Sequence, residues 1–280
     1  KLSLPQMLRQ NSAEVIVVDF SCPEGTRDYV RTDFPAVKVV AVEGEDYFSN
    51  WKARNAGAAA ASSNVLIFCD PDTVLADDAG AWISDTLPER AFGFFERAKT
   101  VRFNTSGLRL AANQLRGFHV IPAAPFRRLG GYDEVFQGYA ACADTDMESR
   151  LKMMGIAQYS MDPNIIGSVI EHDNSDRTRH HRDPTATSYC AGLLYRKAKD
   201  ALLRIRRRLN LPLETRINLY ETAREAAAKL GSPDETVGME VRIEQQPLLM
   251  PRQLGYEKGI HKISLRVEVS VVDRLAAIPD

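Results

Sequence analysis

The segment Asn64-Val-Leu-Ile-Phe-Cys-Asp-Pro-Asp72 decides the predicted fold. Residues 64–69 form an almost wholly apolar run, which is typical of a strand buried on both faces of a parallel sheet. The run ends at Asp70, and Asp72 follows after one intervening residue. Open α/β sheets bind their ligands at the edge where such strands end. The segment therefore predicts a sheet-edge site that carries two carboxylates.

Strands and helices are expected to alternate around this segment. Apolar runs at 14–19 and 37–42 predict two earlier strands, and the alanine-rich stretch 51–61 predicts a helix before the third. Apolar residues at helical spacing predict a later helix over 144–155. The pattern indicates the α/β class, with a mixed, mostly parallel sheet flanked by helices.

The predicted domain organisation has two parts. We expect a catalytic domain over residues 1–185, and a C-terminal extension over 186–280. Two helices are predicted in the extension, and the apolar/polar alternation of 263–273 predicts a β element near its end.

Composition excludes several classes of protein. The 280 residues are 44% hydrophobic and carry a net charge of -1, so no overall field attracts nucleic acid. No apolar run reaches the roughly 20 residues that span a bilayer. We expect a cytoplasmic protein with free thiols, because the four cysteines show no CxxC pair. The basic run 204–208 leaves peripheral contact with an anionic membrane open, beside the alternative of a solvated helix face.

The DxD sequence at Asp70 and Asp72 suits a divalent cation. Mg²⁺ and Mn²⁺ prefer oxygen ligands, and a bound cation bridges protein carboxylates to phosphate oxygens. The alternative is an ordinary turn in which Asp70 caps a helix and Asp72 is solvated.

Five short motifs share an order with a known family. They are Val17-Val-Asp19 followed by Ser21, Ala53-Arg-Asn-Ala-Gly57, Phe68-Cys-Asp-Pro-Asp72, Gly130-Gly-Tyr-Asp-Glu134 and Ala143-Asp-Thr-Asp146. In this order the chain resembles the family 2 glycosyltransferases, which have the GT-A fold, over roughly residues 4–182. The resemblance implies an inverting transfer of a sugar from a UDP- or GDP-sugar to the hydroxyl of a glycan or small-molecule acceptor. It also implies that Mn²⁺ or Mg²⁺ is required.

The resemblance also implies roles for individual residues. Asp19 would bind the nucleoside base, with Ser21 beside it, and Arg54 and Asn55 would flank the nucleotide. The DxD would bind the ribose through Asp70 and the metal through Asp72, and Asp144 would be the catalytic base.

The chain departs from the family pattern in two places. Family members open with a strand and a Pro-Thr-containing loop that forms part of the nucleotide pocket. We expect that first strand to be absent from this chain, so either the chain is incomplete or its pocket differs. The usual glutamate before the base is Ala143 here, which makes Asp146 a competing base. Either aspartate could instead be an N-cap.

The segment 171–181 is rich in histidine and arginine. His172 is expected to complete the metal shell, and Arg177 to bind diphosphate oxygens. A solvated basic loop is the alternative reading of these residues.

Two other functions stay open at this point. One is a sugar nucleotidyltransferase, although the glycine-rich, basic signature typical of that class is not found. The other is a noncatalytic GT-A module that binds a nucleotide-sugar or a glycan. Turnover of a nucleotide-sugar separates both from a transferase.

Overall fold

The computed structural model describes residues 2–10, 14–95, 100–102, 109–111, 117–138, 142–170, 175, 178–229, 236–245 and 261–270. The chain divides into two compact units, which are treated separately below. The first comprises Lys1–Glu134 with Ala143–Arg182, and the second comprises Val135–Cys142 with Asp183–Asp280.

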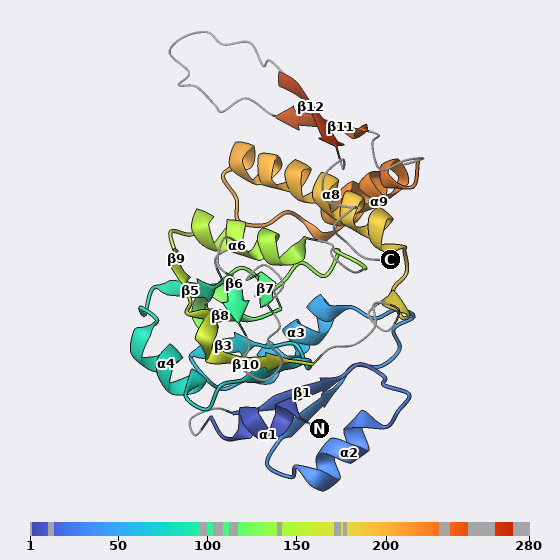
Figure 1. Ribbon diagram of the computed structural model, residues 1–280. Helices are drawn as coiled ribbons and strands as arrows, with labels where there is room; N and C mark the ends of the chain where they lie inside the picture. Colours follow the sequence, from blue (N-terminus) through green and yellow to red (C-terminus); the bar gives the residue numbers. More distant parts are fainter. Residues whose placement is uncertain are drawn as a thin grey trace. The chain divides into compact units, whose positions relative to one another are not determined.

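The first unit begins with a parallel βαβ arrangement (Figure 1). Strand β1 (Ile16–Asp19) pairs in parallel with β2 (Lys38–Ala41), and helix α2 (Thr26–Asp33) connects them. Helix α3 (Asn50–Ala60) packs against β1, where a Cβ atom added at Gly57 would lie 3.1 Å from the side chain of Val18. The last residue of β1, Asp19, is thereby delivered to the edge at which the strand ends.

A four-stranded sheet forms the centre of the first unit. Its order is β3 (Val65–Phe68), β8 (His119–Pro122), β5 (Ala91–Phe94) and β9 (Ala157–Ser160). Strand β8 runs antiparallel to both β3 and β5, whereas β5 and β9 are parallel. The α/β class and the mixed character of the sheet are confirmed.

Shorter strands surround this sheet. Strand β4 (Thr73–Leu75) pairs antiparallel with β10 (Ile166–Val169), and β6 (Thr100–Arg102) pairs with β7 (Arg109–Ala111). Because β4 begins directly after the DxD, both aspartates lie in the tight turn between β3 and β4. The amide of Thr73 donates to the carbonyl of Asp70 across that turn, at 3.1 Å.

Helices cover the strands of the first unit. The remaining ones are α1 (Ser3–Leu8), α4 (Ala79–Thr86), α5 (Ala123–Arg128), α6 (Ala143–Met153) and the 3₁₀ turn η2 (Pro163–Ile165). The side chain of Gln10, just after α1, bonds to the amide of Gly80 and the carbonyl of Ala76. Side chains from α4, β4, β8 and β10 pack into one buried apolar cluster, which fixes the strand ends that border the DxD turn.

The second unit has a helical hairpin and a β ribbon. Its helices are α8 (Thr185–Arg206) and α9 (Leu213–Ala227), and its strands β11 (Thr236–Gln245) and β12 (His261–Ser270) are antiparallel. Helix α8 ends where the backbone of Arg207 turns left-handed, at φ 50°.

Aromatic side chains form the interior of the second unit. The ring of Phe136 lies 4.8 Å from that of Tyr195, which in turn lies 5.5 Å from Tyr220. The Tyr220 hydroxyl donates to the carbonyl of Gln137 and accepts from its amide, so the segment 135–138 is bonded to α9. No described helix in either unit is both long and apolar enough to span a membrane.

Candidate functional site

Arg54, on the inner face of α3, lies at the centre of the site. Its side chain is only 7% exposed, and its Nη2 donates to Asp70 Oδ1 at 2.8 Å and to the carbonyl of Gly117 at 2.7 Å. Its Nη1 lies 3.4 Å from Asp144 Oδ1. One guanidinium thus joins the DxD turn, the approach to β8 and the first turn of α6.

Aromatic rings surround the buried guanidinium. The Arg54 Cζ lies 5.5 Å from the ring centroids of Trp51 and Tyr132, and 6.0 Å from that of Phe68. Burial lowers the pKa of Arg54, but the charges of Asp70 and Asp144 outweigh it and raise the pKa above its usual value. The site therefore contains a fixed positive charge beneath two carboxylates.

Gly117 allows the Asp70 carboxylate to reach this position. A Cβ atom at residue 117 would overlap the Asp70 carboxyl group, so only glycine leaves room for it. The sequence around Gly117 gives no local signal of this contact, because Asp70 is distant along the chain.

The structure separates the two competing aspartates of α6. Asp146 is completely buried, and its Oδ2 accepts from Arg150 Nε at 2.8 Å. The same guanidinium also donates to the carbonyls of Leu129 and Gly131. Asp144, in contrast, has 18% of its side chain exposed and faces Arg54. Asp146 thus positions Arg150, which links α6 to the turn at Gly130 and Gly131. Asp144 is partly exposed.

Asn55 fixes the other part of that turn. Its Nδ2 donates to the carbonyl of Tyr132 at 2.9 Å and to Glu134 Oε1 at 2.7 Å, and its Oδ1 accepts from the amide of Tyr132. Gly131 has a φ of 74°, which glycine adopts without strain. The described hydrogen bonds of Asn55 are therefore within the protein, and its role beside a nucleotide stays a prediction.

His119 and Tyr132 form a second polar contact that sequence analysis did not identify. The Nδ1 of His119 lies 2.9 Å from the Tyr132 hydroxyl and 4.0 Å from Asp144 Oδ1. Burial raises the pKa of Tyr132, so its hydroxyl stays protonated. A histidine within the apolar stretch of β8 was the available signal for this pair.

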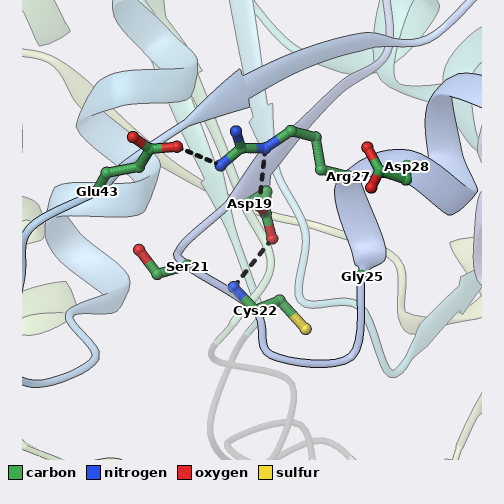
Figure 2. Close-up of a pocket in the computed structure, with 7 residues that line it drawn as sticks. All are labelled: Asp19, Ser21, Cys22, Gly25, Arg27, Asp28 and Glu43. Atoms are coloured by element: carbon green, nitrogen blue, oxygen red, sulfur yellow. Dashed lines mark hydrogen bonds and ion pairs between the residues drawn. The ribbon is translucent and has the colours of Figure 1, made fainter.

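A pocket of about 450 Å³ opens where β1 ends (Figure 2). Asp19 is buried at its base, with Oδ1 accepting from the amide of Cys22 and Oδ2 accepting from Arg27 Nε, each at 3.2 Å. Ser21, at φ 53°, lines the same pocket and donates to the carbonyl of Val42. Asp19 and Ser21 thus line one pocket, and their contact with a nucleoside stays a prediction.

Asp72 lies on the β10 side of the DxD turn and is partly buried. Its carbonyl accepts from the amide of Ile170 at 2.7 Å, so the end of β10 is bonded to the second aspartate of the motif. The other two predicted residues of this region, His172 and Arg177, lie outside the described residues.

A cation at the DxD turn would have to be held largely by groups of its substrate. Among the described residues, no group of three or more His, Cys, Asp or Glu side chains is placed to hold a metal ion. Mg²⁺ is commonly bound by only one or two carboxylates, with phosphates and water completing the shell. Asp70 and Asp72 carry oxygen atoms of that kind, and Oδ1 of Asp70 also accepts from Arg54.

Comparison with known proteins adds one structural similarity. No family model and no curated protein sequence matches the chain. Solved structures similar to it include the mannosyltransferase PcManGT from Pyrobaculum calidifontis, in complex with GDP-Man and Mn²⁺. That match has 17% sequence identity and a TM-score of 0.47, and covers 82% of this chain and 71% of the other. Similarity at this level carries no argument about activity, so the function has to be inferred from the site.

Proposed function

We propose that the chain is a nucleotide-sugar glycosyltransferase of the GT-A type. The observation that carries this proposal is the position of Arg54, which joins Asp70 of the DxD to Asp144 of α6 through one buried guanidinium. These residues come from separate motifs whose order resembles family 2 glycosyltransferases. Their meeting at one point supports a shared role in binding a donor and activating an acceptor.

Asp144 is proposed as the catalytic base. It is accessible, and the nearby positive charge of Arg54 favours its ionised form, which can accept the proton of an acceptor hydroxyl. Its position in the first turn of α6 also favours a negative charge. Asp146 is the weaker candidate, because it is completely buried against Arg150. Attack on the side opposite the leaving diphosphate would invert the anomeric centre.

Donor binding is proposed to involve residues at the ends of two strands, β1 and β3. Asp19 and Ser21 would contact the nucleoside, and Asp70 would contact the ribose. A divalent cation, Mn²⁺ or Mg²⁺, bound through Asp72 would neutralise the charge that builds on the departing diphosphate.

Two further donor contacts are proposed from the sequence. His172 follows Ile170, the residue bonded to Asp72, by two positions, and is proposed as an additional metal ligand. Arg177 is proposed to bind diphosphate oxygens, because its planar guanidinium matches phosphate geometry.

Turnover of UDP- and GDP-sugars with Mn²⁺ tests the proposal. We expect Asp144→Asn to retain nucleotide binding and to lose about 10²- to 10⁴-fold in rate, the usual contribution of a general base. Asp85→Asn is the matched control, since Asp85 is exposed on α4. Nucleotide binding without turnover in the unmodified protein would instead indicate a noncatalytic module, and full activity of Asp144→Asn would refute the assignment of the base.

A further inference from the structure

The pocket at the end of β1 has an unusual balance of polar groups. It is lined by one cationic side chain, Arg27, and by three carboxylates, those of Asp19, Asp28 and Glu43. Its volume of about 450 Å³ is within the range of small-molecule sites. A ligand that fits it must therefore offer several hydrogen-bond donors, together with acceptors for a single guanidinium.

Arg27 organises these groups in the structure. Its guanidinium lies between Glu43 and Asp19, donating to Glu43 Oε1 at 2.7 Å and to Asp19 Oδ2 at 3.2 Å (Figure 2). These bonds use two of the five guanidinium N–H donors of Arg27. The Asp19 carboxylate is only 4% exposed and is held by Arg27 and the Cys22 amide, so its position is fixed before any ligand arrives.

The nucleobases differ in how well they match such a pocket. Guanine presents the N1–H and N2–H₂ donors side by side, next to the O6 and N7 acceptors that arginine contacts with two hydrogen bonds. Uracil presents one N–H between two carbonyls, and therefore needs a donor on each side of a single acceptor. A pocket with three carboxylates and one arginine matches the first pattern.

We propose that this pocket binds guanine and that Arg27 determines the choice of base. The proposal rests on the function proposed above, and it names the donor as a GDP-sugar. The carboxylates of Asp19 and Glu43 accept from N1–H and N2–H₂, while the fork of Arg27 donates to O6 and N7.

Binding of GDP, IDP and UDP to the full chain, measured by calorimetry with Mn²⁺, tests this inference. We expect GDP to bind at least about tenfold more tightly than UDP, and IDP, which lacks the 2-amino group, to bind more weakly than GDP. Arg27→Ala and Arg27→Lys should each weaken GDP about 5- to 150-fold, the value of one bidentate base contact, and change UDP much less. Lysine keeps the charge but not the fork.

A second arginine of α2 supplies the control for these measurements. Arg31→Ala removes an exposed arginine one turn further along α2 and should leave all three affinities unchanged. Tighter binding of UDP than of GDP would overturn the choice of guanine while leaving the transferase proposal intact. Equal losses for GDP and UDP in both Arg27 variants would overturn the selecting role of Arg27, and no binding of either nucleotide would overturn both proposals.

Discussion

The ion pair between Arg54 and Asp70 offers a quantitative test of the site. Removing the guanidinium by Arg54→Met keeps most of the side-chain volume, but leaves Asp70, Asp144 and the carbonyl of Gly117 without their shared donor. Loss of one partner of a buried pair costs about 3 to 5 kcal/mol. We expect the lower end, about 3 kcal/mol, because 36% of the Asp70 side chain is exposed and water screens it.

A double-mutant cycle separates the pair from its surroundings. Asp70→Asn keeps the shape of the side chain and removes its charge, so it should cost less than Arg54→Met. The coupling energy between the two changes should be about 1.5 to 3 kcal/mol, the usual value of a hydrogen bond to a charged group.

Tryptophan fluorescence in urea is a suitable assay for the cycle. The two tryptophans of the chain, Trp51 and Trp82, both belong to the first unit, so their signal reports unfolding of the unit that contains the site. A coupling energy below about 0.5 kcal/mol would place the pair among exposed ion pairs and refute the reasoning from burial.

Two further changes test neighbouring parts of the site. Gly117→Ala should lower the free energy of unfolding by about 1 to 3 kcal/mol, because the new Cβ overlaps the Asp70 carboxylate. The same urea titration measures this loss. An unchanged midpoint would contradict the close approach of Asp70 to residue 117. Burial raises the pKa of the Cys69 thiol in the native protein. In the unfolded chain the thiol has a pKa of about 8.5. Above that pH the unfolded chain therefore loses a proton that the native protein keeps. The contribution of Cys69 to stability is therefore complete below pH 8.5 and falls by up to about 1.4 kcal/mol per pH unit above it. Cys69→Ser should lose less stability than the unmodified protein between pH 8 and pH 10, and equal losses would contradict the shift.

The strands that deliver the site were accessible to sequence reasoning. The apolar run before Asp70 is a strong local pattern, and β3 covers 65–68 within it. Strand β4 was not predicted, because three residues are too short to show a period and the strand depends on pairing with β10. Turn composition alone could not indicate that the DxD is held between two strands.

The contacts between motifs depend on tertiary structure. Nothing in the local sequence around Arg27 identifies Asp19 and Glu43 as its partners, since the three residues come together only when β1, α2 and β2 pack. The pairing of Asp146 with Arg150 is different, because an acid four residues before a base on a helix is a recognisable pattern. That pattern agrees with the sequence-based choice of Asp144 over Asp146 as the base.

The central claim is that the DxD turn binds a nucleoside diphosphate through a divalent cation. Calorimetric titration of GDP and UDP tests it most directly, with Mn²⁺, with EDTA, and with Asp72→Asn in place of the unmodified chain. We expect at least one nucleotide to bind with Mn²⁺, and to lose at least about tenfold in affinity (~1.4 kcal/mol) both in EDTA and in the variant. Affinity that is unchanged by chelation and by loss of the Asp72 carboxylate would contradict the account.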